Sequence, residues 1–335
     1  MKQYTTKFIA EIGVNHNGSI KIAKKLIDHA VRVKADYVKF QIYNTDNLVS
    51  QNAKSAPYQR SNKNVNQYNL LKKYELSHKQ HLLLFKYCKK KKIRYLASPF
   101  DLESAKFLVE KLKLKTIKIA SGEIESFDIL DYFSKLKIDL ILSTGASSIK
   151  EIDNAIKILT SNNLPKKKIT LLHCTSSYPA KINEINLNVI KILRNKFKIN
   201  IGYSDHSEGI LVSIAAYLLG ATFIERHLTL NKKMKGPDHI SSLEPNEFKE
   251  MIEKVKALKI ILGSKTKKVT KSEMINLKYI RKSIFAKKQI KKGTKFSSKN
   301  LILKRPQIGM KPKEYVKILG KTSTKNYNSG QIISE

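Results

Sequence analysis

The 335-residue chain carries 65 Lys plus Arg against 27 Asp plus Glu, a formal net charge of +38 at pH 7. Its 41% hydrophobic and 27% charged residues are typical of a globular protein and exclude an intrinsically disordered one. Only seven of the basic residues are Arg, whereas nucleic-acid recognition favours the bidentate guanidinium, so we expect no nucleic-acid partner. A protein that binds polyanions through its lysines is the alternative from a different functional class.

Two further classes are excluded by the apolar segments and the cysteines. No apolar run reaches the ~18 residues that a membrane span needs, and Glu11 and Asn15 interrupt any signal-peptide core at the N-terminus. Cys88 and Cys174 are too few for a disulfide framework. We therefore expect a cytoplasmic protein without a membrane partner.

Short β-branched segments alternate with amphipathic segments along the chain. The strand-like segments are 8–16, 37–43, 94–100, 116–123, 139–146, 169–178, 200–206 and 223–230; the helical patterns are 20–33, 78–91, 102–112, 126–136, 149–159, 187–196, 209–219 and 245–262. This repetition predicts an α/β protein with a parallel sheet, and its size matches a (β/α)8 TIM barrel. A doubly wound open sheet is the alternative, although no G-x-G-x-x-G follows the first strand.

Two segments depart from the alternation. Residues 45–74 form a polar insertion that is too long for a plain connection, so we expect a lid or substrate loop there. After a barrel domain at 1–263, a linker at 264–278 leads to a small mainly-β domain at 279–335, with short strands at 283–286, 301–303 and 331–333.

Polar residues recur where the predicted strands end. Polar groups at the carboxyl ends of barrel strands face the catalytic mouth, so we expect one active site built from the whole rim. They are Glu11, Asn15 and His16; Lys39 and Gln41; Ser98; Lys118, Ser121 and Glu123; Ser143 and Thr144; His173, Thr175, Ser176 and Tyr178; Ser204, Asp205 and His206; and Glu225 and His227.

Two lysines and two histidines in this set indicate the chemistry. Lys39 and Lys118 lie on apolar strands, where an unpaired charge is costly, so we expect them to bind a phosphate or carboxylate. Structural bridges from these lysines to Glu11 or Glu123 are the alternative. His206 and His227 end neighbouring strands and could bind one divalent metal that keeps positions open for substrate and water, or be hydrogen-bonded core histidines. Further candidates are His16, His173 and His239.

A series of motifs resembles the sialic acid synthase family, which includes N-acetylneuraminate and legionaminate synthases. In chain order they are IAEIGVNHNGS, VKFQIY, ASPFDLES, IKIASGE, ILSTGA, LLHCTSSYP, IGYSDHS, IERHLTL and GPDHISSLEP. The segments IRKSIFAKKQIKKG and KRPQIGMKP are similar to the small antifreeze-like (SAF) domain of these enzymes. The resemblance covers essentially the whole chain.

The resemblance implies a transferase that condenses phosphoenolpyruvate with an N-acylated hexosamine, giving a nine-carbon 2-keto sugar acid and phosphate. We expect an N-acetylneuraminate synthase acting on N-acetylmannosamine. A legionaminic acid synthase using a 2,4-diacetamido-trideoxyhexose is the alternative; the VKF-Q strand and the APYQ segment (56–59) resemble the pseudaminic branch less. A synthase of the aldose-phosphate type would need a second phosphate site, and no further basic cluster lies at the strand ends.

The resemblance also implies roles for single residues. His206 and His227 would bind a divalent metal, typically Mn2+ with Mg2+ or Co2+ as alternatives, that polarises the aldehyde. Glu11 or Glu123 would handle the attacking water. Arg305 would reach the sugar in the barrel of a partner subunit, which implies a domain-swapped homodimer. Phosphoenolpyruvate would contact Lys39, Lys118, Ser121, Ser176 (Asn in some members) and Ser204, and the sugar would contact Glu11, Gln41, Tyr178 and Asp238, with Glu123 in the same inner shell.

Overall fold

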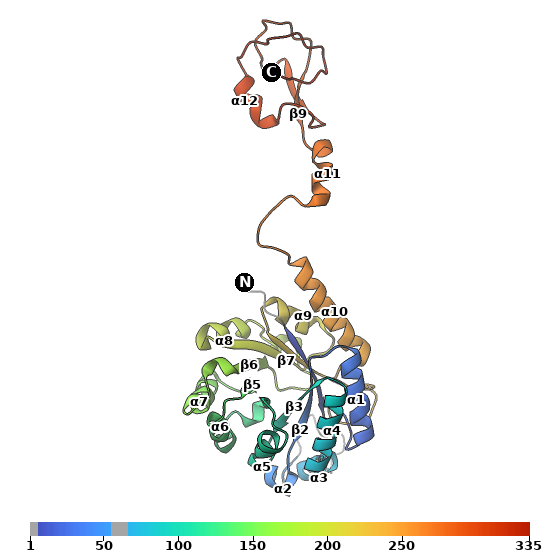
Figure 1. Cartoon of the computed structure of the whole chain (residues 1–335), viewed down its shortest axis with the longest axis vertical. Coiled ribbons are helices and arrows are strands. Elements are labelled where there is room, and N and C mark those ends of the chain that lie inside the picture. The colour runs from blue at the N-terminus through green and yellow to red at the C-terminus, as the bar shows by residue number, and fades with distance from the viewer. Residues whose placement is uncertain (1–5, 55–65) are drawn as a thin grey trace. The chain divides into compact units, whose positions relative to one another are not determined.

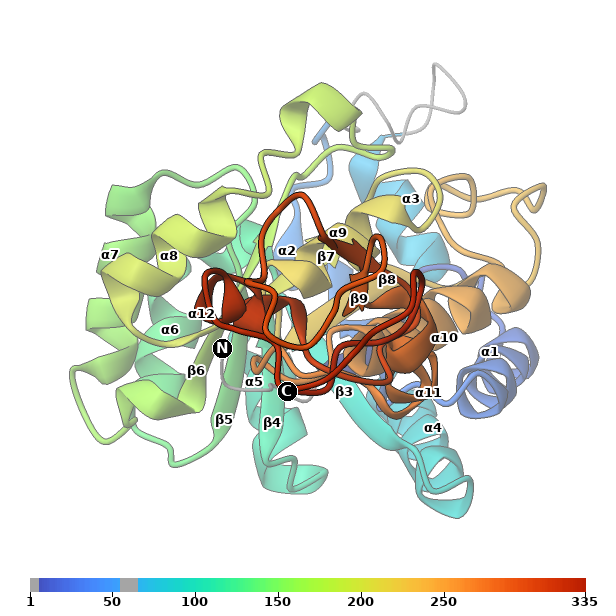
Figure 2. The ribbon, with the colours of Figure 1, turned by 90° about the horizontal axis from the view of Figure 1, so that it is seen from above.

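The computed structural model describes residues 6–54 and 66–335, which form two compact units that divide between Ile261 and Leu262. The first unit is a near-closed barrel of eight parallel strands surrounded by helices, as Figures 1 and 2 show. The predicted (β/α)8 barrel is confirmed. No helix in the described part of the chain is long and apolar enough to cross a membrane.

The barrel strands follow the order β3-β2-β1-β8-β7-β6-β5-β4, and β3 lies beside β4 without a hydrogen-bonded ladder between them. The strands are β1 (Lys7–Gly13), β2 (Tyr37–Ile42), β3 (Arg94–Pro99), β4 (Thr116–Ile119), β5 (Asp139–Ser143), β6 (Ile169–Cys174), β7 (Asn200–Asp205) and β8 (Phe223–His227). The outer helices are α1 (Ile20–Arg32), α4 (His78–Lys90), α5 (Leu102–Lys106) continued by the π-helical η2 (Phe107–Lys111), α6 (Phe127–Ser134), α7 (Ile149–Thr160), α8 (Val189–Phe197), α9 (Leu211–Leu218) and α10 (Pro245–Ile261).

Several predicted strands extend too far at their carboxyl ends. The fourth was expected to reach residue 123, but β4 ends at Ile119 and Ser121–Glu123 forms the 3-10 turn η3. The sixth was expected to reach residue 178, but β6 ends at Cys174. The polar rim residues beyond these strand ends no longer pair with a neighbouring strand; they bond to each other and to loop backbone instead. The polar pattern in the sequence therefore runs past the end of each strand.

The barrel interior is layered because strand side chains alternate between its two faces. A fully apolar cluster fills the interior near the amino ends of the strands; it consists of Ile9, Tyr37, Leu96, Ile141, Leu172 and Phe223. Two residues further along these strands the inward positions become polar or thiol-bearing: Glu11, Lys39, Ser98, Ser143, Cys174 and Glu225. The apolar layer therefore closes the barrel beneath a polar layer that faces the mouth.

A buried histidine outside the barrel interior makes stability depend on pH. His81 of α4 is fully buried, with Nδ1 2.7 Å from the Tyr95 hydroxyl oxygen and Nε2 without a hydrogen-bond partner. Burial lowers the pKa of His81 to about 3. The folded state therefore disfavours the proton that the unfolded chain binds below pH 6.5, and stability is lost as pH falls from 6.5 towards 3.

Acidification from pH 7 to pH 5 is expected to cost about 2 kcal/mol of unfolding free energy through His81 alone. His81→Gln should remove this part of the pH dependence, measured by urea unfolding at both pH values. Tyr95→Phe is the control, because it deletes the hydrogen-bond partner and leaves the imidazole buried. A pH dependence that is equally steep in His81→Gln would refute the assignment.

The insertion at 45–74 is partly helical rather than a plain loop. It contains α2 (Thr45–Leu48) and α3 (Gln67–Tyr74), which begin at the capping side chains of Asn44 and Asn66. Glu75 ties the two together, accepting hydrogen bonds from Thr45 and pairing with Lys72 at 3.3 Å. The APYQ segment lies outside the described residues.

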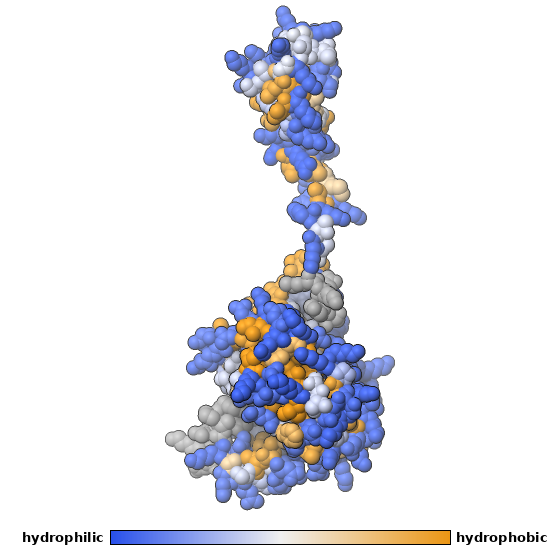
Figure 3. Space-filling view, turned by 90° about the vertical axis from the view of Figure 1, so that its left-hand side faces the viewer, coloured by the Kyte–Doolittle hydropathy of each residue, from blue (hydrophilic) through white to orange (hydrophobic). Residues whose placement is uncertain are grey.

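The second unit contains a two-stranded antiparallel sheet of β9 (Ser283–Ala286) and β10 (Leu301–Lys304), with η6 (Pro312–Glu314) and α12 (Tyr315–Ile318). The predicted strand at 331–333 is wrong, because Ile332 makes only an isolated bridge to Phe285. The predicted linker contains helix α11 (Lys271–Ile280), capped by Thr270. Its apolar side chains, such as Ile275, are exposed. Figure 3 shows hydrophobic surface as orange patches among hydrophilic blue.

Candidate active site

A cavity of about 600 Å³ opens at the carboxyl ends of the barrel strands. Residues from all eight strands or the loops after them line it, as the polar rim predicted. The predicted site residues among its lining are Glu11, Lys39, Gln41, Lys118, Ser121, Glu123, Ser176, Tyr178, Ser204, His206 and His227. Asp238 and Arg305 are not part of the lining.

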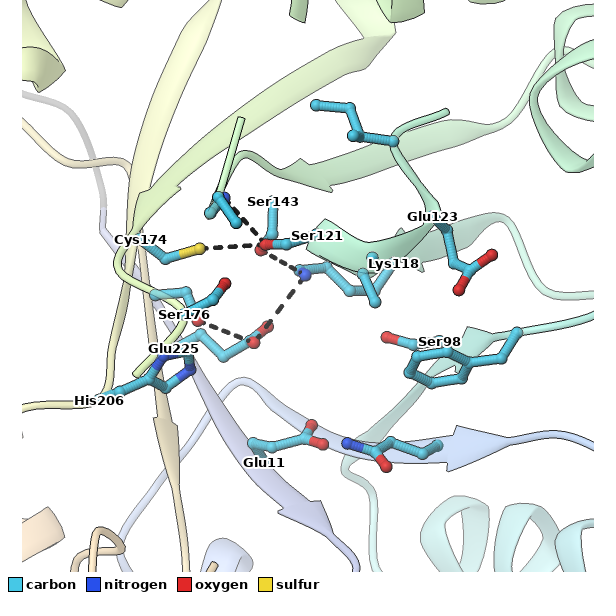
Figure 4. Close-up of a pocket in the computed structure, with 18 of the residues that line it drawn as sticks. Glu11, Ser98, Lys118, Ser121, Glu123, Ser143, Cys174, Ser176, His206 and Glu225 are labelled. Carbon is cyan, nitrogen blue, oxygen red and sulfur yellow. Dashed lines mark hydrogen bonds and ion pairs between the residues drawn. The ribbon is translucent and has the colours of Figure 1, made fainter. Parts of the chain in front are cut away.

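The floor of the cavity is a buried cluster of two lysines and two glutamates. Lys39 Nζ lies 3.0 Å from Glu11 Oε2 and 3.3 Å from Glu225 Oε1. Lys118 Nζ lies 4.0 Å from the same Glu225 oxygen and donates to Ser143 Oγ at 2.6 Å. Figure 4 shows Lys118 directed at Ser143 and Glu225. The lysines therefore have carboxylate partners, but Glu123, which was one expected partner, is not among them.

Burial and charge act against each other in this cluster. Burial alone would lower the pKa of Lys39, but Glu11 and Glu225 outweigh it and raise that pKa. Burial lowers the pKa of Lys118 to about 8, because Glu225 at 4.0 Å offsets the effect of burial only in part, and the Lys39 charge adds to the lowering. Of the two lysines, Lys118 is thus the one whose charge is less fully compensated by carboxylates. An anion near its ammonium group would stabilise the protonated form.

A set of small polar groups lies beside Lys118. Ser121 Oγ accepts from the Gly145 backbone N–H at 2.9 Å and lies 3.2 Å from Cys174 Sγ. A methyl group added to Gly145 would overlap Ser176 Oγ and lie 3.0 Å from Ser121 Oγ. Only a glycine leaves room for both hydroxyls, which together with the backbone N–H groups could complete an anion site.

Gly145→Ala is therefore expected to raise the Kd for phosphoenolpyruvate, the anion that the resemblance implies, by at least about tenfold. The methyl group displaces Ser121 and Ser176, and each lost hydrogen bond to a charged ligand costs roughly 1.5–3 kcal/mol. Titration calorimetry measures this. Ser134→Ala is the control: it removes a buried hydroxyl at the end of α6 that bonds to the Asp131 carbonyl oxygen and to Asn162, costs about 1 kcal/mol of stability and does not line the cavity. An unchanged Kd in Gly145→Ala would contradict the proposed anion site.

His206 and His227 lie side by side in the same cavity, with ring centroids 5.6 Å apart. His206 Nδ1 lies 2.8 Å from the Thr175 carbonyl oxygen, so this nitrogen carries the hydrogen and Nε2 keeps its lone pair. His227 Nδ1 is buried without a hydrogen-bond partner. Tyr178 packs on His206 at 4.1 Å between ring centroids.

These two imidazoles fit a divalent transition metal. Burial lowers the pKa of His206 to about 4 and lowers that of His227 well below its usual value, so both rings are neutral near pH 7. Neutral imidazole is the form that binds metal. Among residues 6–54 and 66–335, no group of three or more His, Cys, Asp or Glu could hold an ion, so substrate and water would supply the other ligands.

The two candidate acids differ in their surroundings. Glu11 is buried. A Cβ atom added to Gly13 would lie 3.1 Å from Glu11 Oε1, 3.2 Å from His227 Cε1 and 3.4 Å from Asp238 Oδ2, so these three side chains meet around Gly13. Glu123 is only half-buried and accepts from Ser126 Oγ at 2.5 Å. Glu11 thus lies beside His227 and Asp238, whereas Glu123 belongs to the cavity rim.

The remaining predicted residues lie elsewhere. His16, His173 and His239 do not line the cavity; His173 Nε2 lies 2.8 Å from the Ile185 carbonyl oxygen. Arg305 is exposed and belongs to the second unit.

The cavity also contains residues to which no role was assigned. Three of them, Ser98, Ser143 and Glu225, belong to the polar rim that was expected to face the mouth, and the alternation of the strands places them on the inward face with Lys39. Several apolar residues of its wall carry no comparable signal, among them Leu48, Val49, Leu71 and Phe100.

Comparison with known proteins adds the family context. Residues 26–267 match the NeuB family and residues 281–335 match the SAF domain. The N,N'-diacetyllegionaminic acid synthase of Campylobacter jejuni is 46% identical over 98% of this chain and 99% of its own length. The synthase of the same name from Legionella pneumophila is 38% identical over 98% and 93%. The crystal structure of the N-acetylneuraminic acid synthetase of Leptospira borgpetersenii is 34% identical, with a TM-score of 0.70 over 81% of this chain and 90% of that one.

Proposed function

Because the chain belongs to the NeuB family and is a sialic-acid-type synthase, we propose that it makes N,N'-diacetyllegionaminic acid from phosphoenolpyruvate and a 2,4-diacetamido-trideoxyhexose. The sequence alone favoured N-acetylneuraminate synthase, with the legionaminic reaction as the alternative. The relatives support the alternative better, since two legionaminic acid synthases are 46% and 38% identical, against 34% for the neuraminic acid synthetase.

The observation that carries the proposed chemistry is that two buried lysines and two neutral histidines line one cavity. Lys39 and Lys118 would bind the carboxylate and phosphate of phosphoenolpyruvate by charge-assisted hydrogen bonds. The hydroxyls of Ser121, Ser176 and Ser204 would add donors to the same anion. This arrangement would fix the enol carbon relative to the histidine pair.

In the proposed reaction the enol carbon attacks the sugar aldehyde and forms the new C–C bond. Water then adds to the cationic carbon that remains, and the adduct expels phosphate by C–O cleavage. A divalent metal, typically Mn2+, on His206 and His227 would supply a Lewis acid for the aldehyde oxygen. Glu11 is proposed to orient the attacking water because it lies beside His227, and Glu123 at the rim is the alternative. Gln41, Tyr178 and Asp238 are proposed to contact the sugar.

A substrate comparison tests the proposal. The protein with Mn2+ and phosphoenolpyruvate should release phosphate with a 2,4-diacetamido-trideoxyhexose at a kcat/KM at least about tenfold above that with N-acetylmannosamine. Mass spectrometry identifies the nine-carbon product. The reverse order of the two sugars would restore the neuraminate assignment, and no phosphate release with any hexosamine would refute the synthase reaction.

We also propose a homodimer in which Arg305 of one subunit completes the sugar site of the other. The second unit is small and carries the exposed Arg305. Its helix α11 exposes apolar side chains such as Ile275, which a partner subunit could cover.

Mixing inactive Lys118→Met protein with Arg305→Ala protein should then restore activity. One site of each mixed dimer has both intact residues, so random exchange returns about a quarter of the wild-type rate. Phosphate release after co-refolding measures it. Activity no greater than the sum of the two separate variants would contradict the shared site.

A further inference from the structure

The carboxyl ends of β7 and β8 are joined by an ion pair that does not face the cavity. Arg226 Nη1 lies 2.8 Å from Asp205 Oδ2, and both side chains are fully buried. The two residues are partners in the β7–β8 ladder. Because strand side chains alternate, the pair points away from the cavity that the next residues, His206 and His227, line.

The pair also fixes the backbone on the far side of His206. Arg226 Nη2 donates to the Ser207 carbonyl oxygen at 2.7 Å. Asp205 Oδ1 accepts from the Ser207 backbone N–H at 3.0 Å and from its hydroxyl at 2.7 Å. Asp205 Oδ2 accepts from Ser213 Oγ of α9 at 2.5 Å. His206 thus lies between Asp205 and Ser207, and hydrogen bonds of the ion pair hold both of these neighbours. The guanidinium belongs to Arg226, the residue directly before His227.

Stability alone is a poor explanation for this arrangement. Buried ion pairs seldom recover the cost of removing both charges from water, and apolar replacements of similar volume are often neutral or stabilising. Arg226 Nε is moreover buried without a hydrogen-bond partner, which adds to the cost. What the pair does provide is a fixed relation between the two strand ends that carry the imidazoles.

We infer that Asp205 and Arg226 are positioning residues that hold the His206 and His227 rings at the separation needed to share one divalent cation. This inference rests on the proposed metal-dependent reaction and extends it to a pair that touches neither substrate nor metal. Groups that bond directly to a metal ligand typically change its affinity ten- to a hundredfold when they are lost. Asp205 and Arg226 act one step further out, through the backbone on either side of His206 and directly before His227.

The test is Mn2+ binding to metal-free protein, followed by the electron paramagnetic resonance signal of free Mn2+. The double variant Asp205→Asn/Arg226→Met avoids leaving one buried charge unpaired. It should stay folded, by circular dichroism, and raise the Kd for Mn2+ by at least about tenfold. The Kd for phosphoenolpyruvate without metal should change less than about twofold, because Lys39 and Lys118 keep their partners. Arg226→Lys keeps the charge with one donor group and should give an intermediate Kd for Mn2+.

Arg194→Met is the matched control. This arginine of α8 also bonds to backbone, donating to the carbonyl oxygens of Leu219 and Gly220 at 2.9 and 2.7 Å. These carbonyl groups precede the amino end of β8, whereas His227 lies at its carboxyl end. It should lower the melting temperature without changing the Kd for Mn2+. A folded double variant with a Kd within twofold of wild type, or an equal rise in Arg194→Met, would overturn the inference.

The remaining outcomes are equally decisive. If the double variant does not fold, an unchanged Kd in Arg226→Lys overturns the inference. Wild-type protein that forms product and binds Mn2+ while the variants bind it equally well refutes the positioning role alone. Wild-type protein that binds no Mn2+ refutes the metal site and the inference together.

Discussion

Replacing Lys118 with Met is expected to lower kcat/KM for phosphoenolpyruvate by about a thousandfold. Truncating one member of a buried, hydrogen-bonded charge pair costs 2–5 kcal/mol or more, and each 1.4 kcal/mol is tenfold. Lys118 Nζ lies 2.6 Å from Ser143 Oγ and 4.0 Å from Glu225, so its loss removes a cation that carboxylates compensate only weakly. The barrel should stay folded, because Met has a similar length and Glu225 keeps Lys39 and Ser204 as partners.

Lys115→Met is the matched control for this prediction. Lys115 is exposed just before the amino end of β4, the strand that carries Lys118, and its replacement removes the same charge from the chain. It should change kcat/KM less than about twofold, because exposed charges are screened by salt. Equal losses in the two variants would mean that the general positive field, rather than one buried ammonium, attracts the substrate.

The pH dependence of the same residue gives a second readout. With a pKa of about 8, Lys118 is mainly protonated at pH 7 and mainly neutral at pH 9. Phosphoenolpyruvate should therefore bind more weakly as pH rises through 8, by up to about tenfold per unit. Lys118→Arg stays charged throughout and should flatten this part of the profile. A wild-type Kd that does not change between pH 7 and 9 would contradict the role of Lys118.

The layered barrel explains why much of this site could be predicted from sequence. Strand side chains alternate with a fixed period, so an apolar residue such as Ile9 at one inward position places Glu11 inward as well. Their places at strand ends were therefore enough to predict that Lys39 and His227 line the same site, before any contact between side chains was known. The carboxylate neighbour of Lys118 was not predicted: Glu11 and Glu123 were the expected partners, whereas Glu225 lies nearest. Which rim glutamate faces a given lysine depends on how the barrel closes, and a single sequence does not show this.

Other features had no local signal in the sequence. The strand ends were placed too far along the chain because polar residues such as Ser121 continue an extended-looking pattern into a turn. The apolar wall at Leu48 and Leu71 comes from an insertion whose helices are too short to show a clear period. The ion pair of Asp205 and Arg226 is a matter of register between two strands, which a single sequence does not contain.

Replacing His227 with Ala is expected to raise the Kd for Mn2+ by at least about a hundredfold. Loss of an outer partner of a metal ligand already costs ten- to a hundredfold, and His227 would be one of only two protein ligands. The alternative is that His227 is a core histidine that serves packing, since Tyr178 lies edge-on to it at 5.8 Å between ring centroids. The two roles make different predictions for binding and for stability.

Two controls separate the roles. His173→Ala also removes a buried imidazole, one that lies 2.8 Å from the Ile185 carbonyl oxygen outside the cavity, and should cost stability without changing the Kd for Mn2+. In His227→Ala the Kd for phosphoenolpyruvate without metal should stay within about threefold of wild type, since Lys39 and Lys118 keep their positions. If the Mn2+ titration of His227→Ala matches wild type, His227 is a packing residue. A metal would then have to bind at a different set of groups in the cavity, because one imidazole cannot hold it alone.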